Sequence, residues 1–254
     1  MTRPTLNSAC GPALALLLCA CGGPEGPPPP AAGAIPSSQT IGSAIVTGRV
    51  LFAGTPPPRK PLRMSGESVC HRPDDPALSE DVIVNPDGSL RNVVVHVVSG
   101  LGDRVFAPPA EPAGMDQQGC LFIPHVMPAQ VNQFVEFKNS DPAAHNVRSV
   151  GMRNRPFNVS MSTKGRSVQR FFAEPEFVKI RCDIHAWMSA WIPVVAHPFF
   201  ALTSSDGVFR IQGLPAGEYT IEAWHETLGT RSQNVTVTEG GVHEIGFTFA
   251  ARQN

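Results

Sequence analysis

Residues 180–188 read "IRCDIHAWM" and place a cysteine, a histidine and a methionine at intervals of three residues. The stretch lies between one apolar run and a second, "AWIPVVA" (190–196), which is typical of a short loop joining two strands. One loop would thus offer a thiolate, an imidazole and a thioether, from Cys182, His185 and Met188, and copper takes these ligands together. The other interpretation is a set of core residues, because cysteine and methionine are often buried.

A second imidazole has to come from elsewhere, because one short loop cannot surround a metal ion in a trigonal plane. The obvious donor is His145 in "NSDPAAHNV" (139–147), which follows an alternating, strand-like segment and a turn. Zinc fits less well, since "CDIH" has no further cysteine or histidine at similar spacing. We expect no metal at the other histidines considered: His125, His197, His225 and His243 have no partner at ligand spacing, and His71 follows Cys70 in a loop.

"NSDPAAHNV" followed by "CDIHAWM" (182–188) resembles the ligand pattern of the cupredoxins, the blue-copper family of plastocyanin and amicyanin. The resemblance implies that Asn146 ties the two ligand loops together by hydrogen bonds, and such contacts orient metal ligands. It also implies one type 1 copper site that transfers single electrons. The implied ligands are three equatorial residues and one axial methionine: His145, Cys182, His185 and Met188.

In the cupredoxins the histidine of this loop reaches the surface through an apolar patch, where electrons pass in and out. Trp187, Met161 and Pro193 are the side chains from which this chain could build such a patch. The alternative is that Trp187 packs inward as part of the core. The sequence leaves both open.

Short apolar or alternating runs bounded by turns recur from residue 44 onward, and none shows a sustained helical period. The 26 prolines and 23 glycines leave little room for long helices. We therefore expect an all-β protein built of sandwiches. The expected strands lie within 44–54, 81–85, 90–100, 129–140, 167–174, 176–182, 190–196, 199–211, 217–226, 231–241 and 242–250.

Near the end of the chain, "SSDGVFRI" and "GLPAGEYTIEAW" resemble the carboxypeptidase regulatory-like domain, a small transthyretin-like β-sandwich. Its first two strands would be "TGRVLFAGTP" (47–56) and "NVVVHVVSG" (92–100), far upstream. The resemblance implies a Greek-key cupredoxin sandwich at 113–197, inserted into a sandwich made of 44–112 and 198–250. The alternative is two consecutive domains, with the upstream part donating strands to the copper domain.

The N-terminus has one positive charge, a short apolar run and then Cys21, which fits an export signal at residues 1–20. "LCAC" (18–21) resembles the bacterial lipobox and implies cleavage before Cys21 and lipidation of its thiol. The alternative is an ordinary secretory signal. Residues 21–43 are rich in proline and glycine and form a tether rather than a core. We expect a protein anchored by lipid on the periplasmic side of a membrane, with inner or outer membrane left open.

Six cysteines occur in the chain, and two of them would leave with the signal. Exported proteins usually pair their remaining thiols. Cys70 and Cys120 both lie in loop-like contexts, so we expect a disulfide between them. This pairing leaves Cys182 as a free thiol, consistent with a metal ligand or an inert buried group.

A net charge of −1 gives no attraction for nucleic acid. The chain has no Gly-x-Ser-x-Gly elbow and no phosphate-binding glycine loop before a helix, so we do not expect an enzyme. The sequence thus favours an exported, lipid-anchored blue-copper protein that passes electrons between redox proteins of the cell envelope. The alternatives are a non-redox β-sandwich that binds envelope components, and a copper storage or delivery protein.

Overall fold

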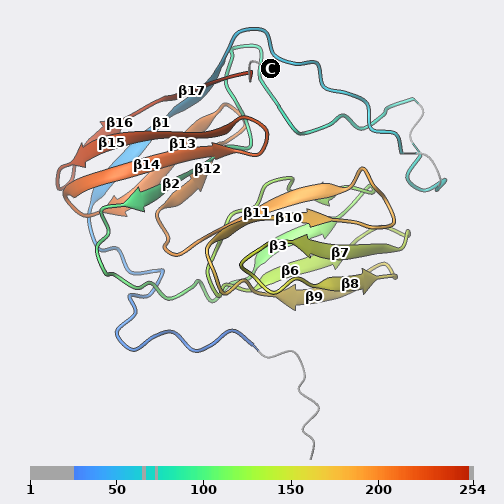
Figure 1. Cartoon of the computed structure of the whole chain (residues 1–254), viewed down its shortest axis with the longest axis horizontal. Coiled ribbons are helices and arrows are strands. Elements are labelled where there is room, and N and C mark those ends of the chain that lie inside the picture. Colours follow the sequence, from blue (N-terminus) through green and yellow to red (C-terminus); the bar gives the residue numbers. More distant parts are fainter. Residues whose placement is uncertain (1–25, 65–66, 72–73, 252–254) are drawn as a thin grey trace, which may run out of the picture.

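The computed structural model describes residues 26–64, 67–71 and 74–251. These residues form strands, turns and loops without any helix, and they build two β-sandwiches that lie side by side (Figure 1). The prediction of an all-β sandwich protein is therefore confirmed. The predicted signal segment and Cys21 lie outside the described residues. Within the described ranges, no helix is available that could span a membrane.

One sandwich, here named the terminal sandwich, takes its strands from both ends of the described chain. One of its sheets has the order β13-β1-β16, with β17 also pairing with β1, and the other has the order β12-β2-β14-β15. Its strands are β1 (Ala44–Ala53), β2 (Val94–Ser99), β12 (Phe200–Leu202), β13 (Val208–Leu214), β14 (Gly217–His225), β15 (Gly229–Val237), β16 (Val242–Glu244) and β17 (Phe247–Ala250).

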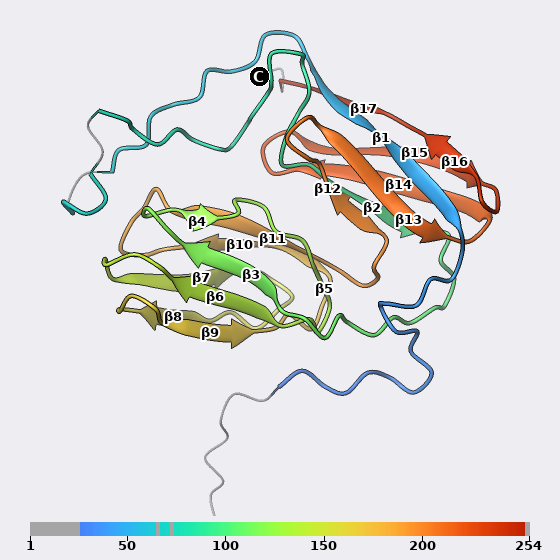
Figure 2. The ribbon, with the colours of Figure 1, turned by 180° about the vertical axis from the view of Figure 1, so that it is seen from behind.

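The second sandwich, named the central sandwich, takes all its strands from the middle of the chain (Figure 2). Its sheets have the orders β5-β11-β10-β7-β8 and β4-β3-β6-β9. Its strands are β3 (Ala113–Gln117), β4 (Phe122–Ile123), β5 (Ala129–Gln130), β6 (Val135–Asn139), β7 (His145–Val150), β8 (Asn158–Met161), β9 (Ser167–Arg170), β10 (Glu176–Arg181) and β11 (Ser189–Val195).

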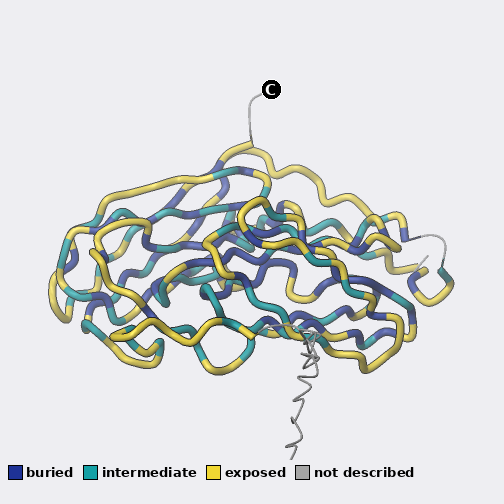
Figure 3. Tube along the Cα trace, turned by 60° about the horizontal axis from the view of Figure 1, so that its bottom comes forward, coloured by how far each residue is buried: buried dark blue, intermediate teal, exposed yellow. Residues whose placement is uncertain are grey.

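Each sandwich has its own hydrophobic core. In β1 every second residue is buried, as expected for a strand with one face on a core. Figure 3 shows buried residues along the strands and exposed residues mainly in the connections. The connection between β1 and β2 departs from this division, because its residues Leu62, Met64 and Cys70 pack into the core of the central sandwich. A segment that precedes β2 in the chain therefore covers part of the other sandwich.

Three of the expected strands are each divided in the structure. The run 129–140 forms β5 and β6, because Asn132 adopts a positive φ of 64° and turns the chain from one sheet to the other. The run 199–211 is divided between β12 and β13 by a turn in which Gly207 has a φ of 74°. The run 242–250 breaks into β16 and β17. Alternation predicted these residues as extended but could not show that the chain changes sheet.

Other differences concern short or weakly patterned strands. The expected hairpin between 81–85 and 90–100 is reduced to a single bridge, Val84 to Leu90, and to β2. Neither β3 nor β8 was predicted from the sequence. β3 reads "AGMDQ" and lacks the apolar alternation of a typical strand, yet it pairs with both β4 and β6. Hydrogen bonding to its two neighbours in the sheet thus outweighs the weak intrinsic preference of this sequence for the strand conformation.

The two sandwiches meet through aromatic side chains and a buried ion pair. The ring of Trp224 on β14 lies 4.6 Å from that of Phe177 and 5.3 Å from that of Trp191, centre to centre. Beside them, His125 of the central sandwich contacts Glu226 of the terminal sandwich. Offset and edge-to-face aromatic contacts of this kind stabilise an interface beyond the area that they bury.

At Gly48, the backbone of β1 comes very close to the backbone at Ile245. A Cβ atom at this position would lie 1.6 Å from the carbonyl oxygen of Ile245, in the break between β16 and β17. Backbone cannot retreat from such a contact as a flexible side chain can. The parallel pairing of β1 with both short strands therefore requires glycine here.

We predict that Gly48→Ala lowers the free energy of unfolding by about 1–3 kcal/mol, the usual cost of overpacking. Urea unfolding followed by circular dichroism measures the change. Gly114→Ala in β3 is the matched control, because no atom lies within 4 Å of the Cβ that it adds. Equal stability of the two variants would contradict the close approach.

Candidate metal centre

The loop that carries Cys182, His185 and Met188 joins β10 to β11. The ladder between these strands ends with the pair Arg181 and Ser189, so both ends of the loop are fixed by sheet hydrogen bonds. Inside the loop, the amide of Cys182 donates to the carbonyl of Met188 at 3.1 Å, and the amide of Met188 donates to the carbonyl of His185 at 2.9 Å. The backbone therefore holds the three side chains in a compact turn.

His145 is the first residue of β7, which pairs with β10. The structure brings it to the loop: one ligand atom each of His145, Cys182 and His185 lies within 4.8 Å of the others. The two Nδ1 atoms are 2.9 Å apart, and Cys182 Sγ lies 3.9 Å from His185 Nδ1. All three side chains are buried. Two imidazoles and one thiol thus converge, each imidazole through its Nδ1 atom.

Met188, the predicted axial residue, is also buried, with 1% of its surface exposed. It lies at the end of the same hydrogen-bonded turn. The four residues selected from the sequence are therefore buried within one small region of the central sandwich. Thiolate, imidazole and thioether together form a soft donor set, which fits copper better than it fits a hard cation.

Asn146, the next residue in β7, bridges the two ligand segments. Its Oδ1 accepts a hydrogen bond of 2.7 Å from the amide of Asp183 and lies 3.3 Å from Cys182 Sγ. Its Nδ2 donates to the carboxylate of Asp183 at 3.0 Å and to Asn158 on β8. The side chain therefore links β7, β8 and the loop.

Asp141 is a further residue of the site, and the sequence analysis did not single it out. Its Oδ2 accepts a hydrogen bond of 3.0 Å from His145 Nε2, on the side of the ring away from the other ligands. The same carboxylate accepts the amides of Gly119 and Cys120 at 2.6 and 2.7 Å. A carboxylate behind a ligating histidine fixes its ring and its tautomer. The four-residue spacing to His145 was the available signal.

Asn139 shapes the turn that presents Asp141 and His145. Its side-chain amide donates to the carbonyls of Ala143 and Met161 at 2.9 and 2.7 Å, and its oxygen accepts the amide of Asp141 at 2.9 Å. Asparagine suits this position because its side chain imitates backbone groups in turns. Asn139 and Asp141, the first and third residues of "NSDPAAHNV", therefore both hold His145 in position.

The outer edge of His185 is covered rather than open to solvent. Its side chain is 3% exposed, and its Nε2 lies 3.9 Å from Cys70 Sγ and 4.0 Å from a carboxylate oxygen of Glu67. Cys70 and Cys120 are joined by a disulfide bond, and both are fully buried. The ring of Trp187 covers another part of the imidazole, at 4.8 Å between centres.

The patch suggested by the sequence is therefore not formed as expected. Met161 and Pro193 are buried, so they cannot contribute to an exposed surface. Trp187 is half-buried, and its Nε1 donates to the carbonyl of Cys120 at 3.0 Å. Of the three side chains, it alone extends from the site toward the outside. The sequence could not show that the connection between β1 and β2 returns to cover this region.

Electrostatics favour the metal-binding forms of the Cys182 thiol and of His185, but not that of His145. Burial acts to raise the pKa of the Cys182 thiol, but the His145 imidazole and the backbone amide of Asn146 outweigh it, so the pKa is lowered. Burial acts to lower the pKa of His145, but Cys182 and Asp141 outweigh it and raise the pKa. Burial and the neighbouring His145 lower the pKa of His185. A thiol with a lowered pKa gives up its proton to a metal more readily.

The other histidines have different surroundings. His125 has no partner at ligand spacing in the sequence, but the fold brings its ligand atom within 4.8 Å of those of Asp81 and Glu226. These partners are distant in the sequence, so spacing alone could not reveal them. Burial lowers the pKa values of His197 and His225 to about 4, and neither belongs to a group of potential metal ligands in the described residues.

No family model matches the chain, and no curated protein matches it. Among solved structures, the chain is similar to a copper-containing nitrite reductase from Thermus scotoductus SA-01, with 24% identity and a TM-score of 0.31 over 39% of this chain. The match spans 25% of that reductase. A purple cupredoxin from Nitrosopumilus maritimus matches with 20% identity and a TM-score of 0.29, over 32% of this chain and 98% of that one. An oxidized mutant of amicyanin matches with 18% identity and a TM-score of 0.31, over 39% and 97%.

We predict that Asp141→Asn weakens copper binding about 10–100-fold, because the amide cannot replace the carboxylate toward both His145 and the two backbone amides. Competition with a calibrated chelator measures the affinity. Asp206→Asn is the matched control, since Asp206 lies in the turn before β13 of the terminal sandwich. Unchanged affinity in the Asp141 variant would show that this carboxylate does not support the site.

Proposed function

We propose that this protein is an exported, lipid-anchored type 1 copper protein that transfers single electrons in the cell envelope. The observation that carries the proposal is the convergence of three buried donors, His145 Nδ1, His185 Nδ1 and Cys182 Sγ, from two adjacent segments of the central sandwich. Met188 is the fourth proposed ligand. Copper bound by this donor set alternates between Cu(I) and Cu(II) and so carries one electron at a time.

The surrounding residues suit this role because they hold the donors still. Asp141 fixes the ring of His145, Asn146 fixes the loop against β7, and the ladder of β10 and β11 fixes both ends of the loop. Preorganised ligands need little rearrangement when the charge at the site changes. We do not propose an enzymatic reaction, because electron transfer requires no substrate pocket.

Redox proteins of the envelope are the proposed partners. Trp187 supports a route for the electron, since its ring lies against the His185 imidazole and is itself half-buried. The proposed lipid on Cys21 and the proline-rich segment 21–43 would hold the sandwiches close to a membrane while leaving them free to meet a partner.

Copper storage or delivery is the principal alternative, and it requires a site with a different property. A protein that hands over copper has to release it readily, whereas the cover over His185 from Cys70 and Trp187 opposes release. The burial of the ligands therefore favours electron transfer. A non-redox binding module would have no need of three buried metal-ligating groups that converge on one point.

We predict that the purified protein loaded with Cu(II) is intensely coloured and that Cys182→Ser abolishes the colour. The thiolate is the soft donor whose bond to Cu(II) gives rise to the visible absorption. Met188→Leu should retain copper and colour while raising the reduction potential, because the axial bond is long and weak. Visible spectroscopy and redox titration measure both effects.

His145→Ala and His185→Ala should weaken the colour, with partial recovery when imidazole is added. His243→Ala is the matched control, because His243 contacts Thr238 in the terminal sandwich. A folded wild-type protein that binds no copper would contradict the proposal. Reversible colour that is lost at once to a chelator in the reduced state would favour storage or delivery instead.

For the anchor, we predict that Cys21→Ser moves the protein from the membrane fraction to the soluble fraction, because no acyl chains can then be attached. Cell fractionation followed by immunoblotting measures the distribution. Cys10→Ser provides the control, since this cysteine precedes the proposed cleavage site. Identical fractionation of the wild type and the Cys21 variant would exclude the anchor without affecting the copper site.

A further inference from the structure

A second group of potential metal ligands lies where the two sandwiches meet. It combines His125 of the central sandwich with Glu226, in the turn after β14, and with Asp81, in the connection between β1 and β2. One ligand atom from each residue lies within 4.8 Å of the other two. The ligands therefore come from three distant parts of the chain and from both sandwiches.

Two members of this group are almost fully enclosed. The side chains of His125 and Glu226 are 6% and 7% exposed, and His125 Nε2 is in direct contact with Glu226 Oε1. The other oxygen of Glu226 accepts a hydrogen bond of 2.6 Å from Trp191 Nε1. One oxygen is thus fixed by an indole donor while the other faces the imidazole, as in carboxylates that are oriented for a metal.

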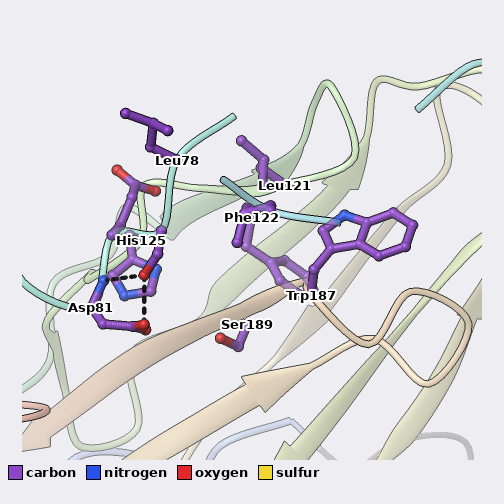
Figure 4. A pocket seen from close by; sticks show the side chains of 10 residues that line it. Leu78, Asp81, Leu121, Phe122, His125, Trp187 and Ser189 are labelled. Atoms are coloured by element: carbon purple, nitrogen blue, oxygen red, sulfur yellow. Dashed lines mark hydrogen bonds between the residues drawn. The ribbon is translucent and has the colours of Figure 1, made fainter. Parts of the chain in front are cut away.

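Two members of the group, Asp81 and His125, line a small cavity of about 130 Å³ (Figure 4). Glu80, Asp81 and His125 line one part of this cavity, and Trp187 and Ser189 line another. Its lining residues include neither lysine nor arginine. Water and ions can therefore reach His125 from the side of Asp81.

The charges around the imidazole are not balanced. Three carboxylates act electrostatically on His125, those of Glu226, Glu80 and Asp81. A protonated imidazole offsets one negative charge, so the group retains an excess of negative charge. Of the three carboxylates, that of Glu226 is enclosed, and an enclosed carboxylate is stabilised by a partner of higher charge.

We propose that Asp81, His125 and Glu226 form a second metal site, which binds a divalent transition-metal ion of the zinc type and joins the two sandwiches. One imidazole and two carboxylates are ligands that Zn²⁺ accepts. The ion replaces the direct contact between His125 and Glu226 and enters through the cavity. Asp81 is exposed, and its carboxylate accepts a hydrogen bond of 2.5 Å from the hydroxyl of Ser79. Because the side chain is not part of a core, it can turn toward the ion without disturbing the packing.

The test is equilibrium dialysis of the purified full chain against Zn²⁺, after one equivalent of copper has been added to every sample. We expect one zinc ion per wild-type chain. Glu226→Gln and Asp81→Asn should each weaken zinc binding about tenfold or more, through loss of a charged ligand. None of these variants changes the centre at Cys182, so any metal bound there is the same in all of them. A difference in zinc uptake between the variants therefore measures binding at the second site alone.

Glu222→Gln is the matched control. Glu222 lies on β14 and faces His96 at 3.5 Å, so it also forms a histidine–carboxylate pair, but this pair has no third potential ligand among the residues that the structure describes. Its zinc binding should equal that of the wild type. Because Asp81 is exposed, its replacement tests the site even if Glu226→Gln destabilises the fold.

Thermal unfolding provides a second readout, because a metal that binds the native state raises the melting temperature. Zinc should raise it in the wild type and in Glu222→Gln, and much less in Glu226→Gln and Asp81→Asn. Zinc uptake that is equal in all four proteins would overturn the proposal. A wild-type protein that binds no zinc would also overturn it. If Glu226→Gln then still lost stability, the contact of His125 with Glu226 would be a simple ion pair.

Discussion

The antiparallel ladder of β10 with β11 and β7 is the constraint on which the candidate metal centre depends. Its pairs Arg181–Ser189 and Arg181–Arg148 place the start of the ligand loop beside the start of β7. Cys182 follows Arg181 directly, and His145 precedes Arg148 by three residues in the antiparallel neighbour. The thiol and the first imidazole therefore meet because of sheet register, and a shift by one residue would turn one of them to the opposite face.

Around the ligands, the chain supplies a continuous set of contacts between its own groups. The turn formed by Asn139 presents Asp141, whose Oδ2 accepts hydrogen bonds from both His145 Nε2 and the amide of Cys120. Cys120 is bonded in turn to Cys70, whose sulfur lies against His185. Hydrogen bonds, the disulfide and the 3.9 Å contact of Cys70 Sγ with His185 Nε2 thus connect the outer edges of both imidazoles.

The disulfide also connects the two architectural units. Cys70 belongs to the connection between two strands of the terminal sandwich, whereas Cys120 lies in the central one. Closing the 50-residue interval between them stabilises the folded state by about 4 kcal/mol in the chain-entropy model. Together with the aromatic contacts of Trp224 and the contact of His125 with Glu226, it opposes separation of the sandwiches.

The sequence by itself determined the all-β class, because short alternating runs, prolines and glycines exclude long helices. It also selected the residues that converge in the candidate centre, since a cysteine, a histidine and a methionine spaced three residues apart can be recognised from the sequence alone. His145 could be added because its surrounding motif is equally local. The role of Asp141 was within reach of the same motif, through its four-residue separation from the histidine.

Only the tertiary structure decided where the chain changes sheet, as at Asn132, because a single backbone angle there leaves the apolar alternation intact. It also decided that the segment around Cys70 covers His185, and that Asp81, His125 and Glu226 form a group. These contacts join residues more than 40 positions apart. Their geometry follows from how whole sandwiches pack, and no local pattern in the sequence records it.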